Sequence, residues 1–493
     1  MRFNEIREMF KLRPYQENCV RSIYDYINSD RHDPVLVVAP VAAGKSLLLA
    51  EAARIMGGNT IILQPSKELL HQNYDKLISY NIPATIYSAS CGKKELSNMI
   101  YATLGSIKKV VGQLKEMGIR NVLIDEAHAG YSPEDGSEFM TFMNELKPKK
   151  VIGFTATPCR LKTMSIGQVS YSQLNFITRM RPVYFKNLIH VIQVEEMIRQ
   201  GFWTPLKYET WDFNGDALKL NSNGSEYTAE SISEAVRKNG LNNLILRRLM
   251  VLKDICRSIL VFMDSVESCN TAAEWMNAKI CAGMAEVVHG GTPKKQREAI
   301  VEGFKSGKTK VVFNYSALGT GFDHPGLDCV IVGRPTFSFS SFYQWLGRAV
   351  RIKDGKDSAL VVDCCNNSSR FGDIRKLSIE NYKGYGWGMF IGDKLITNIP
   401  MGDKVTKTDL DIKAAKKDRR RGLAQGVTAS PVPGRPDHPL GSTLMTFGKY
   451  CGWMLHSIPV SYFKFINETF DWSNDRNREI KEYIDFLIKN NRL

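Results

Sequence analysis

A Gly-Lys-Ser triplet stands where a short apolar run gives way to a stretch with helical periodicity. Residues 39–46 read APVAAGKS. Small residues at such a turn let backbone N–H groups and the helix N-terminus close around phosphates, while Lys45 neutralises the β- and γ-phosphates and Ser46 holds Mg²⁺. The usual GxxxxGKS pattern begins with glycine, but this loop has Ala39 there and Val-Ala-Ala in the middle. We expect a phosphate-binding loop of altered conformation; the alternative is a chance Gly-Lys-Ser at a helix start.

Two adjacent carboxylates follow an apolar run about eighty residues later. Residues 121–128 read NVLIDEAH, with Asp125 and Glu126 at the end of the run. The ends of parallel strands face a nucleotide crevice, so Asp125 can reach the Mg²⁺ shell and Glu126 can orient and deprotonate an attacking water. An acidic loop at a strand end explains one carboxylate but explains poorly a pair downstream of Gly-Lys-Ser. Together the two motifs predict ATP hydrolysis with Mg²⁺.

The elements that must position these residues alternate in type along the chain. Residues 34–160 alternate short apolar runs with longer amphipathic stretches, and a second series of this kind covers residues 258–365. Such runs, bounded by Pro and Gly, predict buried parallel strands with crossover helices. We expect an α/β protein with two tandem doubly wound parallel-sheet domains and a small C-terminal module that is α-rich or α+β. The expected boundaries are 1–203, 204–382, a basic Gly-rich linker at 383–432, and the module at 433–493.

The composition indicates which kind of partner and which cell compartment to expect. The 66 Lys and Arg residues exceed the 51 acidic residues by 15, which favours a polyanionic partner such as nucleic acid. The longest apolar stretch is about half of what a membrane span needs, so no membrane association is expected. The N-terminus lacks the apolar core of a signal peptide, and the ten cysteines show no zinc-ligand spacing. We therefore expect a cytoplasmic protein.

Five motifs in order carry a family resemblance that covers roughly residues 10–365. They are GKS at 44–46, DEAH at 125–128, TAT at 155–157, LGTGFD at 318–323 and QWLGRAVR at 344–351. This set resembles superfamily 2 DEAH-type helicases and translocases, which implies two RecA-like domains. With LRPYQ at 12–16 and GFWTP at 201–205, the chain looks closest to the RadD-like bacterial and phage DNA helicases. The tail has one cysteine and so lacks the zinc module of that group; it resembles a small module appended to some exonucleases.

The resemblance implies roles for residues of both domains. Adenine recognition falls to Gln16 with Arg13 nearby, and the Mg-ATP site to Ala42, Ala43, Gly44, Lys45, Ser46, Asp125 and Glu126. Coupling of hydrolysis to domain movement falls to His128, Thr155 and Thr157. The second domain would sense nucleotide through Gly319, Thr320, Gly321 and Asp323, and close on the γ-phosphate through Gln344, Arg348 and Arg351. Nucleic acid contacts are implied for Ser66, Thr103, Ser106, His289, Gly290 and Thr292.

These features together predict a nucleic-acid-dependent ATPase. The resemblance favours DNA, single-stranded or branched, over RNA, and implies a helicase or translocase in repair, recombination or replication of a bacterium or its phage. One alternative is an ATP-switched DNA-binding adaptor that does not unwind and recruits a protein partner through residues 433–493. The other is an RNA helicase.

Overall fold

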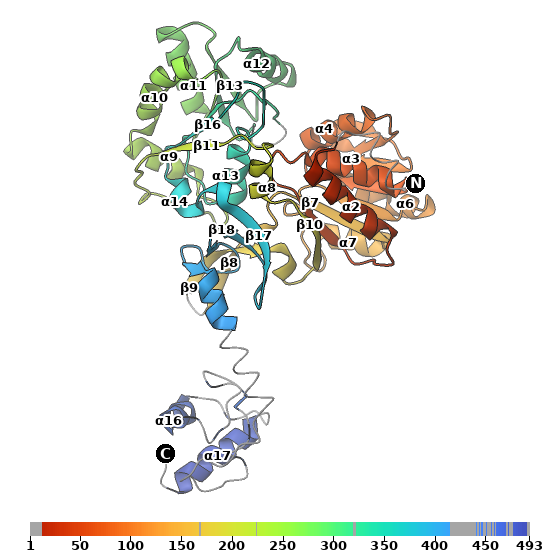
Figure 1. Ribbon diagram of the computed structural model, residues 1–493, viewed down its shortest axis with the longest axis vertical. Helices are drawn as coiled ribbons and strands as arrows, with labels where there is room; N and C mark the ends of the chain where they lie inside the picture. The colour runs from red at the N-terminus through yellow and green to blue at the C-terminus, as the bar shows by residue number, and fades with distance from the viewer. Residues whose placement is uncertain are drawn as a thin grey trace. The chain divides into compact units, whose positions relative to one another are not determined.

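A computed structural model describes residues 12–166, 169–222, 224–318 and 322–414, together with parts of the tail between residues 440 and 490. The chain divides into two compact units (Figure 1). The first consists of Met1–Tyr382 and Gly386–Val405, and the second of Lys383–Tyr385 and Thr406–Leu493. Both α/β domains lie in the first unit.

The first domain is built on a largely parallel sheet in the order β10-β1-β7-β6-β2-β5-β3-β4. Its central strands are buried from end to end, which explains their continuous apolar runs. Only the β3–β4 pair is antiparallel among the pairings of this sheet in the described residues. The strands are β1 (Val35–Val38), β2 (Thr60–Leu63), β3 (Thr85–Ser88), β4 (Lys93–Lys94), β5 (Met99–Ala102), β6 (Asn121–Ile124), β7 (Lys150–Thr155) and β10 (Asn187–Val191).

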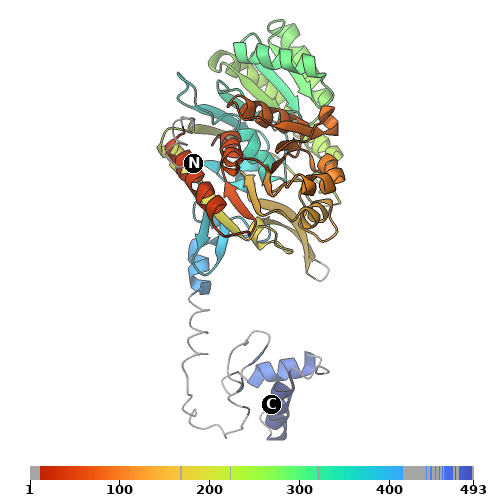
Figure 2. The same cartoon turned by 90° about the vertical axis from the view of Figure 1, so that its right-hand side faces the viewer.

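Helices cover both faces of this sheet. One apolar cluster joins the sheet to α2 (Pro14–Asn28), α3 (Lys45–Met56) and α4 (Lys67–Ile78). A separate cluster on the other face joins it to α5 (Leu104–Ile107), α6 (Val111–Glu116) and α7 (Glu138–Leu146). Figure 2 shows α2 as the red helix next to the N label. The arrangement is a doubly wound sheet, as the sequence predicts.

The second domain repeats the plan with a parallel sheet in the order β11-β16-β15-β12-β14-β13. Its strands are β11 (Leu206–Thr210), β12 (Ile259–Phe262), β13 (Ala285–His289), β14 (Val311–Tyr315), β15 (Cys329–Val332) and β16 (Ala359–Asp363). One face packs on α9 (Ala229–Lys238), α10 (Leu241–Ile255) and α11 (Val266–Lys279). The other packs on α12 (Lys294–Ser306), α13 (Phe339–Leu346) and α14 (Asn367–Phe371), and its apolar cluster continues into the first domain. The two domains therefore share packed side chains.

Three features between and after the domains were not predicted. An antiparallel hairpin of β8 (Cys159–Ile166) and β9 (Val169–Phe176) directly follows the TAT motif, and α8 (Val194–Arg199) precedes the crossing to β11. Strands β17 (Leu377–Tyr382), β18 (Gly386–Ile391), β19 (Lys394–Leu395) and β20 (Val405–Thr406) form a further sheet, in which the β17–β18 and β18–β19 pairs are antiparallel. The expected linker at 383–432 is therefore wrong over Gly386–Ile391. Its glycines suggested a linker, but Met389, Phe390 and Ile391 are buried and Gly386 instead serves the turn at φ +93°.

The described part of the tail contains two helices with their own apolar core. Its helices α16 (Val460–Thr469) and α17 (Arg478–Lys489) share an apolar cluster that includes Phe463, Ile466 and Tyr483. Most of the basic stretch of the linker, residues 415–439, lies outside the described residues. Within the described part of the chain, no helix has the length and apolar character that a membrane crossing requires.

Candidate functional site

The Gly-Lys-Ser segment forms a tight loop between β1 and α3. Ala43 N–H donates to the Pro40 carbonyl at 3.1 Å, and Ala42 and Gly44 take left-handed backbone conformations with φ of +65° and +82°. Helix α3 begins at Lys45, so its first backbone N–H groups, which have no partner within the helix, lie where the loop ends. That arrangement suits an anionic phosphate. The loop therefore closes although alanine occupies the usual first glycine position.

Gln16 on α2 is joined to this loop. Its side-chain Nε2 donates to the Ala43 carbonyl at 2.9 Å, while its Oε1 accepts from Arg13 N–H at 2.9 Å. A Cβ atom at Gly44 would lie 2.5 Å from Gln16 Nε2, so this position needs glycine for space as well as for its φ. The predicted adenine residues and the phosphate loop thus form one connected structure.

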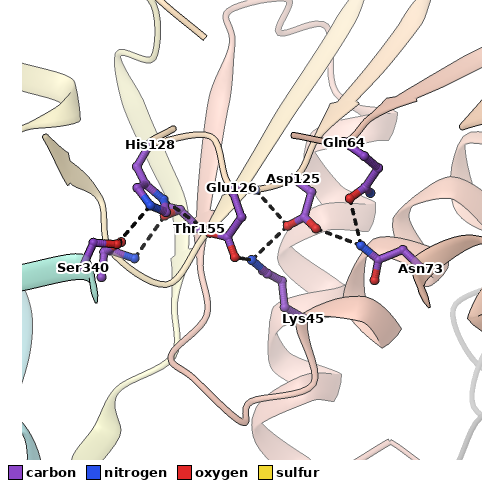
Figure 3. Close-up of polar contacts among 9 residues, drawn as sticks. Lys45, Gln64, Asn73, Asp125, Glu126, His128, Thr155 and Ser340 are labelled. Atoms are coloured by element: carbon purple, nitrogen blue, oxygen red, sulfur yellow. Dashed lines mark hydrogen bonds and ion pairs between the residues drawn. The ribbon is translucent and has the colours of Figure 1, made fainter. Parts of the chain in front are cut away.

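Lys45 lies between the two carboxylates of the acidic motif (Figure 3). Its Nζ is 2.9 Å from Asp125 Oδ1 and also pairs with Glu126. Burial opposes the charged lysine, but the Asp125 and Glu126 charges outweigh it and raise the pKa of Lys45. Burial also raises the pKa of Asp125, against the effect of Lys45. The three groups form a compact charged centre at the carboxyl end of β6.

Asp125 is held in place by groups that the sequence analysis did not single out. Asn73 Nδ2 on α4 donates to Asp125 Oδ2 at 2.8 Å and to Gln64 Oε1 at 3.0 Å (Figure 3). The backbone N–H of Glu126 donates to Asp125 Oδ1 at 2.8 Å, and Glu126 itself has a φ of +45°. These contacts fix the carboxylate plane. A lone asparagine inside a helix gives no signal in the sequence, so it could be found only from the fold.

His128 and the TAT motif form a hydrogen-bonded chain to the second domain. His128 Nδ1 lies 2.8 Å from Thr155 Oγ1, and its Nε2 lies 3.1 Å from Ser340 Oγ on α13 (Figure 3). Thr157 Oγ1 lies 3.0 Å from the same Ser340 hydroxyl. Burial lowers the pKa of His128 to about 3, so the ring is neutral at physiological pH. Ser340, which the sequence analysis missed, joins His128 and Thr157, two of the three predicted coupling residues, to the other domain.

The second domain contributes cations to the same space. Arg348 donates to the Phe322 carbonyl at 2.6 Å, and Arg351 pairs with Asp323. Burial, followed by the neighbouring Arg351 charge, lowers the pKa of Arg348 to about 9, which indicates a cation that an anion would stabilise. Lys356 Nζ donates to the carbonyls of Ala349 and Arg351 in the same segment, and to that of Pro325.

A cavity of about 530 Å³ lies between these groups. Most of the predicted nucleotide residues line it: Arg13, Ala42, Gly44, Lys45, Ser46, Asp125, Glu126, Asp323, Gln344, Arg348 and Arg351. Ala43 belongs to the loop and Gln16 is bonded to it, but neither lines the cavity. Gly319, Thr320 and Gly321 lie outside the described residues. The fold thus brings the GKS and DEAH motifs of the first domain together with the QWLGRAVR motif, which begins about 300 and about 220 residues later in the sequence.

The donor set of this cavity fits a magnesium ion. Ser46 and Asp125 both line it and offer a hydroxyl and a carboxylate oxygen, the hard ligands that Mg²⁺ takes alongside substrate phosphates and water. Asn73 occupies the opposite oxygen of Asp125, so Oδ1 faces Lys45 and the loop.

The predicted nucleic acid residues follow the carboxyl ends of strands in each domain. Ser66 caps α4, with its Oγ accepting from Leu69 N–H at 3.3 Å. Thr103 Oγ1 and Ser106 Oγ lie 3.2 Å apart, and Thr292 Oγ1 accepts from His289 N–H at 2.9 Å, across a turn that includes Gly290. Each polar side chain therefore has a local bonding partner. No contact joins the three groups in the described residues, so they form separate patches.

Comparisons with known proteins agree with this architecture. Residues 9–160 match the family model described as "Type III restriction enzyme, res subunit", and residues 241–353 match "Helicase conserved C-terminal domain". One relative is "Putative ATP-dependent helicase IRC3" of Saccharomyces cerevisiae, 24% identical over 73% of this chain and 52% of its own. A 51.5 kDa protein of a Lactococcus phage is 23% identical over 66% of this chain and 65% of its own. The chain therefore spans about half to two thirds of the length of these curated relatives.

A solved structure shows the same fold. The ATP-dependent Type ISP restriction-modification enzyme LlaBIII, bound to DNA, has a TM-score of 0.53 and 16% identity over 72% of this chain and 28% of its own. The two family matches fall on the two sheets in the order that the five motifs have. The chain therefore belongs to superfamily 2 of the helicases, ATP-hydrolysing enzymes built on two RecA-like domains.

Proposed function

We propose that this protein is an ATP-dependent DNA helicase or translocase that uses ATP in the cavity between its two RecA-like domains. The observation that carries the proposal is that Lys45, Asp125 and Glu126 of the first domain and Arg348 and Arg351 of the second line one cavity. A nucleotide bound by both domains favours their closed arrangement, and hydrolysis removes that preference. A strand held by both domains is then advanced in steps.

In this mechanism each domain supplies a different group to the reaction. Lys45 leaves the carboxylates for the β- and γ-phosphates, which frees Glu126 to orient the attacking water and accept its proton. Arg348 and Arg351 place positive charge on the transferring phosphoryl oxygens. Ser46 and Asp125 would hold Mg²⁺, which neutralises phosphate charge when bound. Arg13 and Gln16 bind the adenine.

Coupling to movement runs through the neutral His128. Its ring lies 3.3 Å from Glu126 through Nδ1 and 3.1 Å from Ser340 through Nε2. A shift of Glu126 on hydrolysis therefore reaches the second domain through one ring, with Thr155 and Thr157 fixing its position.

DNA is proposed as the track on three grounds. The chain carries a net charge of +15, the motifs resemble those of RadD-like DNA helicases, and the structural relative LlaBIII is bound to DNA. The proposed contacts are the patches at Ser66, at Thr103 and Ser106, and at His289, Gly290 and Thr292. Hydroxyls and turn amides suit phosphates and bind without reading sequence.

The setting is proposed from the same resemblance. We propose the RadD-like placement, the boundary between the two RecA-like domains near residue 204, and the exonuclease-type module at 433–493. The phage relative fits the proposed location in the cytoplasm of a bacterial or phage-infected cell, and a task in repair, recombination or replication. We propose that the tail docks a protein partner.

A strand-displacement assay with Glu126→Gln tests the function. The wild type should separate a labelled strand from a forked DNA only with ATP and Mg²⁺, and Glu126→Gln should bind ATP without separating strands. Hydrolysis that persists in Glu126→Gln would refute the site. ATP-dependent binding of DNA without any displacement or translocation would favour the adaptor, and a matched RNA fork opened in preference to DNA would favour the RNA helicase.

A further inference from the structure

The segment that crosses between the two domains passes beside the ATP cavity. Trp203 of this segment contacts the phosphate loop, because its indole Nε1–H donates to the Val41 carbonyl at 3.0 Å. The next residue, Thr204, donates its N–H to the Val350 carbonyl and its hydroxyl to the Arg351 carbonyl, each at 2.8 Å. Trp203 and Thr204 are each 2% exposed, so water does not compete for these bonds. Two consecutive residues thus join the phosphate loop to residues 347–351, called here the arginine segment because they include Arg348 and Arg351.

The preceding residue reaches a third part of the cavity. The Phe202 ring lies 4.6 Å from the Arg13 guanidinium and 5.4 Å from the Tyr15 ring, at the start of α2. The crossing segment therefore contacts three parts of one site: the start of α2, where adenine is expected to bind, the phosphate loop, and the arginine segment. Its length between the two domains cannot change without disturbing all three.

The phosphate loop needs such support because of its sequence. Ala42 has a φ of +65°, a left-handed conformation that a residue with a Cβ atom disfavours and glycine adopts freely. The carbonyls on both sides of Ala42 accept side-chain bonds from outside the loop. Trp203 binds the Val41 carbonyl and Gln16 binds the Ala43 carbonyl. These two bonds stabilise a left-handed turn at Ala42 that glycine at the same position would adopt without such support.

The second domain also packs against the phosphate loop at Val41. A Cβ atom at Gly347 would lie 2.6 Å from Val41 Cβ, so the Val41 side chain packs against the bare backbone of Gly347. Gly347 directly precedes Arg348. Val41 is therefore held by Trp203 through its carbonyl and by the arginine segment through its side chain.

We propose that Trp203 is a positioning residue for ATP binding: its indole N–H holds the left-handed turn at Ala42 and, with Thr204, sets the phosphate loop against the arginine segment. This inference deepens the proposed ATP site and rests on it. Two consequences follow. Removing the donor loosens the loop, and replacing Ala42 by glycine makes the donor dispensable.

The test measures equilibrium binding of a fluorescent, non-hydrolysable ATP analogue with Mg²⁺ to the full chain. Trp203→Phe keeps an aromatic ring and removes the N–H, and should weaken binding about fivefold, the effect of one hydrogen bond. Ala42→Gly in the Trp203→Phe background should restore binding to within about twofold of Ala42→Gly alone. Trp211→Phe is the matched control, since Trp211 Nε1 donates to Glu209 at 2.9 Å outside the cavity, and should bind like the wild type.

Wild-type binding by Trp203→Phe would overturn the inference, and so would a loss that Ala42→Gly does not rescue or that Trp211→Phe shares. Absence of binding by the wild type would instead refute the proposed function. Should Trp203→Phe fail to fold, Ala42→Gly alone tests the held turn. It is expected to raise the thermal midpoint, because glycine removes the strain, and a lower midpoint would contradict the inference.

Discussion

The hydroxyl of Ser340 joins the two domains at the end of the coupling chain, so its removal is a sharp test of that chain. It lies 3.1 Å from His128 Nε2 and 3.0 Å from Thr157 Oγ1, both buried. Each bond contributes about 1 kcal/mol net, so Ser340→Ala should destabilise the closed arrangement by about 2 kcal/mol. Since about 1.4 kcal/mol is a factor of ten, the DNA-stimulated ATPase rate should fall about 30-fold.

The assay compares steady-state ATPase rates at saturating ATP and DNA. Ser341→Ala is the control, because Ser341 Oγ bonds only to Ser338 Oγ, at 3.0 Å within the same helix start, among the contacts of the described residues. It should keep the wild-type rate within about twofold. In a double-mutant cycle, Thr157→Val and Ser340→Ala should be non-additive by about 1 kcal/mol. A wild-type rate in Ser340→Ala, or full additivity, would refute the coupling chain.

Three further predictions concern neighbouring residues. Asn73→Leu removes the donor that holds Asp125, and should lower the ATPase rate about tenfold with thermal stability retained; an unchanged rate would contradict the role of Asn73. Lys356→Met removes the donor to the Ala349 and Arg351 carbonyls, and should lower the rate about tenfold, whereas the exposed Lys353→Met should not; equal effects would contradict this. The third prediction concerns pH. Burial holds the pKa of His128 at about 3 in the folded state, against about 6.5 when unfolded, so only the unfolded chain binds this proton between these values. Stability from neutral His128 is thus complete above pH 6.5 and falls as pH decreases, by at most about 1.4 kcal/mol per unit. Urea unfolding at pH 6.5, 5.5 and 4.5 should show a smaller loss in His128→Gln than in the wild type or the exposed His32→Gln. Equal losses would contradict a buried neutral ring.

Much of the fold was predictable because strands and helices leave periodic patterns. The buried strands appear as unbroken apolar runs such as residues 35–38. The hairpin β8–β9 was missed because its strands carry mixed polar residues, as in Lys162 and Gln173, instead of a clear alternation. The hairpin is instead defined by antiparallel backbone pairing of its two strands, in which Cys159 lies opposite Phe176.

The motif residues of the site were predictable, but the residues that hold them were not. Lys45 and Asp125 belong to motifs that indicate phosphate chemistry, the family resemblance implies the role of Arg348, and the fold brings all three to one cavity. Asn73 and Ser340 act through single hydrogen bonds that only the packed structure defines. Trp203 stood in a quoted motif without a role, because its partner is a backbone carbonyl 162 residues away.

The central claim, a DNA-driven ATPase, is tested most directly by ATPase rates of the purified protein with Mg²⁺. Rates would be compared without polymer and with single-stranded DNA, duplex DNA, branched DNA and RNA of matched length, alongside Glu126→Gln. The account predicts strong stimulation by one DNA form and little by RNA, with no turnover in Glu126→Gln. Equal low rates with every polymer, or stimulation by RNA alone, would contradict it.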